Sequence, residues 1–254
     1  MSGPRLPKAW KWATIEDTVR LDTDSLTPEP ATSYIYVGLE HIESETGVLT
    51  KEQKIAGADI QGQKFQFTNE HILYGKLRPY LNKVALPEIN GICSTDILPL
   101  KPKRNVVREY IAYWLRSKDF LDYASRHATG TKMPRLGPSQ LCKAQIPLPP
   151  LLVQERVVEI LQKAESIRRK RQEALTLADA ILSSTFIAMF GDPRENSRGF
   201  NVTPLGQLAD VRSGVTKGRK LGSKETVEAP YLRVANVQDG YLDLSEVRTI
   251  EVLP

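Results

Sequence analysis

The chain has 254 residues, of which 41% are hydrophobic and 26% charged, and this balance excludes a wholly disordered protein. The formal net charge of +5 favours an anionic partner without being specific for nucleic acid. No continuous apolar run approaches the roughly 18 residues of a membrane span, and the first residues lack the apolar segment of a secretory signal. Together with only 2 cysteines, these features predict a cytoplasmic protein with no membrane partner.

Residues 1–150 predict a mixed α/β domain. Short runs of β-branched and aromatic residues at 34–37 and 64–67 alternate with turn-forming residues, as is typical of strands. A helix is predicted from about Val107 to Tyr123, where apolar residues recur at helical spacing. The sequence Ile-Pro-Leu-Pro-Pro at 146–150 then ends the domain, because proline interrupts regular structure.

Residues 151–190 predict one long helix, because no glycine or proline occurs between Pro150 and Gly191. A helix of about 40 residues is roughly 60 Å long. Apolar residues recur in a heptad pattern that Arg171 interrupts, and such a stripe requires a partner helix. We therefore expect coiled-coil pairing, with another helix or by self-association, through Val157, Ile160, Ala164, Ile167, Ala174, Ala178 and Ile181.

A polar linker at 191–199 follows, and after it the chain repeats its own beginning. The repeat has a period of about 190–195 residues, which indicates a duplicated domain and not a solenoid. Counterparts of residues 65–150 do not follow, so the second copy is expected to be incomplete, whether the chain is a fragment or a naturally shortened protein. The matching segments are 10–15 with 200–205 and 36–42 with 231–237, together with Gly47 and Leu49, which match Gly240 and Leu242.

Sequence motifs of catalysis are missing. The chain has no Asp/Asn-Pro-Pro-aromatic motif of adenine methyltransferases and no G-x-x-x-x-G-K-[ST] phosphate loop. His41, His71 and His127 lack the spacing of metal ligands. We therefore expect no catalytic residue, no metal and no cofactor, although scattered carboxylates such as Asp96 and Glu109 resemble those of a nuclease.

Two basic segments are candidates for DNA contact. In the first, cationic residues alternate with Tyr74, Pro79 and Tyr80, a mixture that suits phosphate contact and equally suits an ordinary strand–turn–strand edge. The second, at 126–135, is small, polar and basic, as expected of a loop that approaches a DNA groove or of a simple surface turn. The candidate residues are Lys76, Arg78, Lys83, Arg126, His127, Thr129, Lys132 and Arg135.

Other prominent residues receive structural interpretations. The short polar side chains of Ser94-Thr95-Asp96 are expected to satisfy nearby main-chain groups. Five aromatic residues are expected to lie in the core, namely Tyr36, Tyr231, Trp10, Trp12 and Trp114. The basic run at 168–171 is either a solvated helix face or a contact to phosphate or to a partner protein.

Three features together resemble the specificity subunits of type I restriction–modification systems. They are residues 72–83 with 91–100, residues 128–136 leading into 146–155, and the long helix. The resemblance covers essentially the whole chain. That family carries two target-recognition domains in tandem, separated by conserved helices. The resemblance therefore divides the chain into a first recognition domain, a spacer helix, a linker and the start of a second recognition domain, at 1–150, 151–190, 191–199 and 200–254.

The same resemblance implies a non-catalytic role in host defence. The chain would bind double-stranded DNA sequence-specifically and direct methylation and restriction by adenine-N6 methyltransferase subunits and a motor-nuclease subunit. Two alternatives stay open. The chain is otherwise an assembly scaffold that does not bind DNA, or a degenerate methyltransferase or nuclease.

Overall fold

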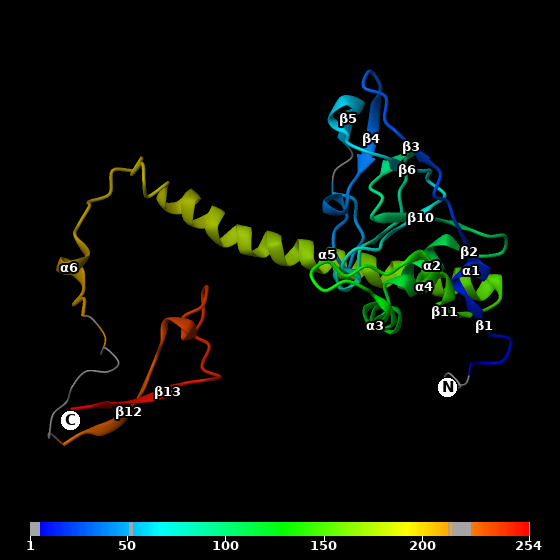
Figure 1. Ribbon diagram of the computed structural model, residues 1–254. Coiled ribbons are helices and arrows are strands. Elements are labelled where there is room, and N and C mark those ends of the chain that lie inside the picture. The colour runs from blue at the N-terminus through cyan, green and yellow to red at the C-terminus, as the bar shows by residue number, and fades with distance from the viewer. Residues whose placement is uncertain (1–5, 51–52, 213, 215–224, 254) are drawn as a thin grey trace. The chain divides into compact units, whose positions relative to one another are not determined.

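The computed structural model describes residues 6–50, 53–212, 214 and 225–253. Two compact units make up the chain, Met1–Ala178 and Asp179–Pro254, and each is described by itself. Helix α5 (Leu151–Phe190) contributes residues to both (Figure 1).

The first unit contains two sheets and a short strand pair (Figure 1). All strand pairings are antiparallel except that of β4 with β9. The larger sheet has the order β3 (Ser25–Leu26), β6 (Lys64–Phe67), β9 (Gly91–Cys93), β4 (Ser33–Val37), β5 (Gln53–Ala56). The smaller sheet has the order β2 (Val19–Leu21), β10 (Ile97–Pro102), β7 (Ile72–Gly75), β8 (Val84–Ala85), and β1 (Lys11–Thr14) pairs with β11 (Gln145–Leu148).

The smaller sheet separates two hydrophobic cores. Successive residues of a strand point to opposite faces. In β7, Ile72 and Tyr74 accordingly belong to the larger core and Leu73 to the smaller one. All four residues of β7 are buried, so this strand is fixed from both sides. The polar segment that follows it therefore starts from a rigid position.

Besides α5, the described part of the first unit contains four short α-helices, and two sequence predictions fail here. Trp12 on β1, which the sequence predicts to lie in the core, is exposed. The helix predicted at 107–123 is two helices, α2 (Arg108–Leu115) and α3 (Lys118–His127). Ser117 has extended backbone angles, and its hydroxyl accepts a hydrogen bond from the N–H of Phe120 at 3.3 Å, which caps α3. The other two helices are α1 (Ile15–Thr18) and α4 (Pro138–Lys143), and the predicted strands at 34–37 and 64–67 are confirmed as β4 and β6.

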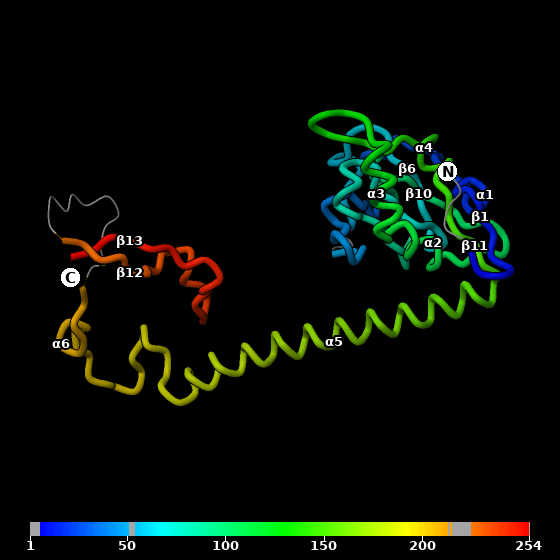
Figure 2. Tube along the Cα trace, turned by 90° about the horizontal axis from the view of Figure 1, so that it is seen from below, coloured from blue at the N-terminus to red at the C-terminus, as the bar shows by residue number. Residues whose placement is uncertain are grey.

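Helix α5 has 40 residues, which confirms the predicted long helix, and Figure 2 shows it as one continuous coil. Its first turns belong to the domain. The Gln154 side chain is buried, donates to the Pro149 carbonyl at 2.9 Å and accepts from the Val107 N–H at 2.9 Å. Val158 lies in the larger core, and Val157 packs against it. From residue 167 to 190 every side chain is exposed.

The same helix qualifies the expectation about membrane spans. Although no continuous apolar run is long enough, α5 contains an 18-residue window with a mean hydropathy of 1.4 and no more than 2 acidic or basic residues. By length and composition this helix is therefore long enough to cross a membrane. The core helix of a soluble protein passes the same test, so the window alone is weak evidence for a membrane protein.

The second unit repeats local elements of the first. Its elements are α6 (Leu205–Leu208), β12 (Val227–Tyr231), the 3₁₀ helix η4 (Val234–Asn236) and β13 (Arg248–Val252). They match α1, β4, the 3₁₀ helix η1 (Leu39–His41) and β5 in order. Isolated bridges join Ile42 to Leu49 in the first copy and Val237 to Leu242 in the second. The repeated start of a second domain is therefore present in the structure.

Candidate nucleic-acid interface

The first basic segment leaves β7 through a sharp turn. Arg78 and Asn82 both have left-handed backbone angles, with φ of 51° and 50°, and they flank the 3₁₀ helix η3 (Pro79–Leu81). Asn82 supports this turn because its side-chain NH₂ donates to Glu45 Oε2 at 2.8 Å. The turn leaves Arg78 and Tyr80 exposed to solvent.

The second basic segment is a loop closed at its base. Thr129 and Arg135 exchange two main-chain hydrogen bonds of 2.9 Å. Gly130 has φ of 101°, a region that favours glycine, and an added Cβ would lie 3.1 Å from the Met133 carbonyl. The loop projects from the domain between α3 and α4 (Figure 2), and Lys132 at its tip is exposed.

Main-chain hydrogen bonds join the two segments, although they lie some fifty residues apart in the sequence. Arg78 N–H donates to the Pro134 carbonyl at 2.7 Å, and Leu136 N–H donates to the Lys76 carbonyl at 2.9 Å. We call residues 76–80 and 126–135 together the paired loops. Because they are bonded at the main chain, their exposed cations form one surface and not two independent tails.

Most of the predicted DNA-contact residues lie on the paired loops. Lys76 is half-buried, and six others are exposed, namely Arg78, Arg126, His127, Thr129, Lys132 and Arg135. Lys83 does not lie with them. Its ammonium group donates to the Leu39 and Ile42 carbonyls at 2.7 and 2.8 Å, so it fastens the turn around η1 and is directed inward.

Arg126 and His127 also have structural partners at the end of α3. Arg126 Nε donates to the Asp122 carbonyl at 3.1 Å. The His127 ring stacks on Tyr123 with centroids 4.1 Å apart, and its Nδ1 lies 2.8 Å from the Tyr123 carbonyl. A cation at a helix C-terminus complements its dipole, so Arg126 stabilises α3 through its charge, whereas His127 does so through its stacking on Tyr123. Both side chains also face solvent.

Sequence reasoning missed one acidic partner of this surface. Arg135 Nε lies 3.0 Å from Asp96 Oδ1, and Nη2 lies 3.4 Å from Oδ2. The hydrogen bond to this carboxylate and its charge raise the pKa of the Arg135 guanidinium. The Ser94-Thr95-Asp96 segment has its predicted structural role too, because the Ser94 hydroxyl accepts from the Asp96 main-chain N–H at 3.3 Å. No local signal links Asp96 to Arg135, since 39 residues separate them.

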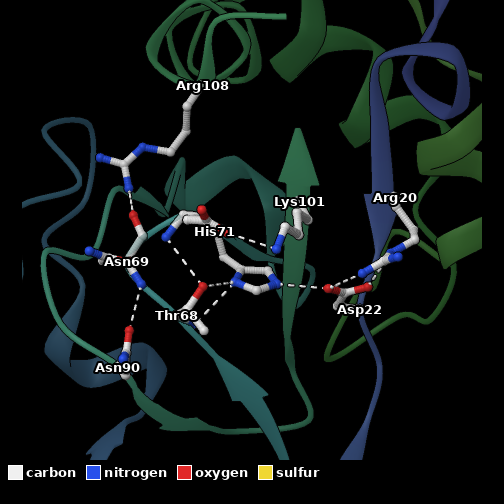
Figure 3. A network of polar contacts seen from close by, with 9 residues as sticks. Arg20, Asp22, Thr68, Asn69, His71, Asn90, Lys101 and Arg108 are labelled. Carbon is white, nitrogen blue, oxygen red and sulfur yellow. Dashed lines mark hydrogen bonds and ion pairs between the residues drawn. The ribbon is translucent and has the colours of Figure 1, made fainter. Parts of the chain in front are cut away.

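A second polar cluster, around His71, resembles a catalytic arrangement at first sight (Figure 3). His71 Nε2 lies 3.0 Å from Asp22 Oδ2, and Nδ1 lies 2.9 Å from the Thr68 hydroxyl. However, the Thr68 main-chain N–H also donates to Nδ1 at 3.0 Å. This bond fixes the proton on Nε2 and occupies the Nδ1 lone pair, so the imidazole is not free to act as a base for Thr68.

The Asp22 carboxylate of this cluster is likewise held by structural partners. Arg20 reaches its two oxygens at 2.6 and 2.9 Å. The hydrogen bonds from Arg20 and from His71 lower the pKa of Asp22 against the opposing effect of burial. The cluster lines an open pocket between the two sheets, with a volume of about 650 Å³. We interpret it as a structural network that ties β2 to the turn before β7.

Thiol and metal chemistry find little support in the part of the chain that the structure describes. Cys93 and Cys142 are both free, and burial raises the pKa of the Cys93 thiol to about 12, which keeps it protonated. Among the described residues no group of three or more His, Cys, Asp or Glu side chains is arranged to hold a metal ion.

The predicted helix-pairing residues divide into two groups along α5. Val157 is half-buried against the core of its own domain, so it is not fully available to a partner helix. The other six are exposed, including Ile160 and Ile167. The basic residues at 168–171 are exposed, and Arg168 and Arg169 line a groove of about 450 Å³ with the loop at 43–48.

Comparisons with known proteins agree on one family. The model of the type I restriction modification DNA specificity domain matches residues 19–177. The specificity subunit of the type I restriction enzyme EcoDI from Escherichia coli is 28% identical over 191 residues, which cover 72% of this chain and 43% of that protein. The MjaIX specificity subunit from Methanocaldococcus jannaschii is 23% identical over 234 residues, 86% of this chain and 52% of that protein. The chain spans about half the length of these curated relatives.

Solved structures show the same fold. A chain from a study of complex assembly and conformational transition of the type I R-M system superposes with a TM-score of 0.60 at 25% identity, covering 80% of this chain and 53% of that one. The HsdS subunit from Thermoanaerobacter tengcongensis superposes with a TM-score of 0.56 at 23% identity, covering 79% of this chain and 53% of that one.

Proposed function

Because the chain belongs to the family of type I restriction modification DNA specificity domains, we propose that residues 1–150 form a target-recognition domain that binds double-stranded DNA sequence-specifically. One observation carries the proposal to particular residues, namely the main-chain pairing of two basic segments into a single exposed surface. Cations at fixed positions on such a surface match phosphates at fixed spacing, and side chains between them reach base edges.

Salt dependence of DNA binding tests this function. Each phosphate contact that a cation makes contributes about −0.9 to the slope of log affinity against log salt concentration. We expect steep salt dependence for the full chain with duplex DNA. Lys132→Ala should reduce the slope by about one if Lys132 contacts a phosphate, or relax the choice of one base if it reads an edge.

Lys143→Ala is the matched control, because Lys143 is exposed on α4, outside the paired loops, and the variant loses the same charge. Equal effects of the two variants would mean that only net charge matters. An absence of salt-dependent duplex binding would favour the alternative of an assembly scaffold that does not bind DNA.

We further propose that the chain is non-catalytic and acts in the cytoplasm, directing adenine-N6 methyltransferase subunits and a motor-nuclease subunit to its target sites. The proposal rests on the family and on the two specificity subunits that the chain resembles. The chain should copurify with such a methyltransferase, and sequencing of the methylated DNA should then reveal one target sequence. Methylation or cleavage by the purified chain alone would contradict a non-catalytic role.

The proposed role of α5 is to pair with another helix and to set the distance between two recognition domains. Its exposed apolar residues support pairing, because a helix with an apolar stripe in water is stabilised by covering that stripe. Ile160→Asp with Ile167→Asp should abolish pairing, since the partner would bury two unpaired charges. Gln162→Asp with Thr176→Asp adds the same charge on the opposite face and should leave the molar mass from sedimentation unchanged.

A four-residue insertion near Ala174 tests the spacer role in the methyltransferase complex. It lengthens the helix by about 6 Å and rotates the following residues by only about 40°. The methylated half-sites should keep their sequences and move apart by one to two base pairs, at roughly 3.4 Å each. A two-residue insertion rotates the helix by about 200° and should abolish paired recognition. An unchanged gap would contradict the spacer role.

A further inference from the structure

The contact between Asp96 and Arg135 leaves part of the guanidinium free. Nε and Nη2 face the two oxygens of the Asp96 carboxylate at 3.0 and 3.4 Å, and Nη1 lies 3.4 Å from the Met133 carbonyl. A guanidinium carries five N–H groups, so these contacts leave two for another molecule. The Arg135 side chain is 44% exposed, and its free groups are therefore accessible.

Asp96 is anchored to the smaller sheet. Its carbonyl accepts from Lys76 N–H at 2.9 Å, and its own N–H donates to the Ser94 hydroxyl at 3.3 Å. The next residue, Ile97, is fully buried and begins β10. The main chain that carries the Asp96 carboxylate is therefore held in a fixed position at the start of β10.

Arg135 is held at its main chain as well as at its side chain. Its N–H and carbonyl both bond to Thr129. A side chain fixed at both ends loses less conformational entropy on binding than a free one. By contrast, the exposed Lys132 at the loop tip makes no hydrogen bond or ion pair among the described contacts, and its ammonium is a point charge without a directional fork.

We propose that Asp96 positions Arg135 to read a guanine in the major groove, an assignment that rests on the proposed DNA-recognition function. Guanine presents two adjacent acceptors there, O6 and N7, which match a pair of N–H donors on one guanidinium. The negative charge of Asp96 also repels phosphates, so it penalises nonspecific contact at Arg135. Asp96 thereby lowers the affinity of Arg135 for DNA of any sequence and increases its preference for guanine.

Selection from random duplexes tests the assignment with the full chain. Bound DNA is sequenced for the wild type, Asp96→Asn, Arg135→Ala and Arg135→Lys. Asp122→Asn is the control, because Asp122 is exposed and the variant loses the same charge, whereas the Arg135 side chain contacts Asp96 and Met133. The wild type should select a motif with a guanine, and all three test variants should lose about tenfold of their preference at that position only. Asp96→Asn should bind mixed-sequence DNA no more weakly than the wild type, and the control should keep the motif.

Several results would overturn the assignment. If Asp96 had only a structural role, Asp96→Asn would bind all sequences equally more weakly and would have a lower unfolding midpoint. Its selected motif would not change. A smaller salt slope for Arg135→Ala with an unchanged motif would make Arg135 a phosphate contact. If Asp96→Asn does not fold, Arg135→Lys still tests the assignment. This variant keeps the positive charge at an exposed site and removes only the pair of adjacent N–H donors. A wild type that selects no motif contradicts the proposed function itself, whereas a motif retained by every variant contradicts only the roles of Asp96 and Arg135.

Discussion

The two copies of the duplicated segment, residues 33–56 and 227–252, have the same local hydrogen bonds and very different burial. In each, the third residue of the 3₁₀ helix accepts a hydrogen bond from the N–H of the residue before that helix. His41 Nδ1 accepts from Gly38 at 3.0 Å, and Asn236 Oδ1 accepts from Arg233 at 2.9 Å. Yet Ile42 is 0% exposed, whereas its counterpart Val237 is 59% exposed.

The difference separates what neighbouring residues determine from what distant ones determine. In the first copy β9 pairs with both β4 and β6, and Leu73 and Ile97 complete the small core. The described part of the second unit contains only the pair β12 and β13. The hairpin geometry therefore forms without those strands, but its apolar side chains stay in contact with water. Four comparisons, taken in order of expected effect, test this separation.

The largest effect is expected from truncating the apolar residue after each 3₁₀ helix. Ile42→Ala should reduce the free energy of unfolding by about 2–5 kcal/mol, because it leaves a cavity in the small core. Val237→Ala should cost less than about 0.5 kcal/mol, as for other exposed positions. Hydrogen exchange of the two hairpins measures both, and equal costs would mean that Val237 is buried in solution.

The glycines in the two turns form a second matched pair. Gly47 and Gly240 have φ of 69° and 80°, so alanine is strained by about 1–2 kcal/mol in either. Only at Gly47 would the new Cβ also meet the Val84 carbonyl, at 1.7 Å, and Arg116 Nη2, at 2.4 Å. Since this disturbs the hydrogen bond between those groups, we expect Gly47→Ala to cost about 2–3 kcal/mol in total. Chemical denaturation would measure the free energy lost in Gly47→Ala, and hydrogen exchange of the 227–252 hairpin would measure the loss in Gly240→Ala. A larger loss at Gly240 would contradict the comparison.

The side chain that caps the 3₁₀ helix should be interchangeable between the copies. His41→Asn supplies the acceptor that the second copy uses, and we expect it to cost less than about 1 kcal/mol. His41→Ala leaves the Gly38 N–H without its partner and should cost about 1–3 kcal/mol. Thermal unfolding distinguishes the two variants. Equal losses would show that the edge contact of His41 with Tyr36, and not the hydrogen bond, is what matters.

The smallest effect concerns the short helices that begin the two copies. Thr14 and Asp17 form a reciprocal cap on α1, whereas Pro204 and Gln207 occupy those positions at α6 without a side-chain cap. Hydrogen bonds from the Thr14 side chain and main chain lower the pKa of Asp17 below its ordinary 3.8. A lowered folded-state pKa adds stability above the ordinary pKa and loses it as the pH falls through the folded-state value. Asp17→Asn should therefore lower the unfolding midpoint slightly at pH 7, and the difference from the wild type should shrink towards pH 2. A difference independent of pH would exclude the carboxylate as its cause.

Sequence patterns predicted the features that depend on neighbouring residues. The strands at 34–37 and 64–67, the long helix and the repeat all follow from local periodicity or self-similarity. The break at Ser117 was missed because one serine cap interrupts an otherwise helical pattern. The inward direction of Lys83 and the partnership of Asp96 with Arg135 depend on contacts across about 40 residues, which a single sequence does not reveal.

The burial of Gln154 and Val158 in the first turns of α5 has a consequence for exchanging domains between related chains. If domains were exchanged between two chains with the junction at Pro150, each domain would receive the start of α5 from the other chain. The residues that fill its core and bond to its main chain, Gln154 and Val158 among them, would then come from a different sequence. A crossover after Glu165, whose carboxylate accepts from the Tyr113 hydroxyl at 2.9 Å, keeps these contacts together. The smallest part that keeps its own core contacts is therefore the globular domain with the first four turns of its helix, and a domain exchange is best joined inside the helix.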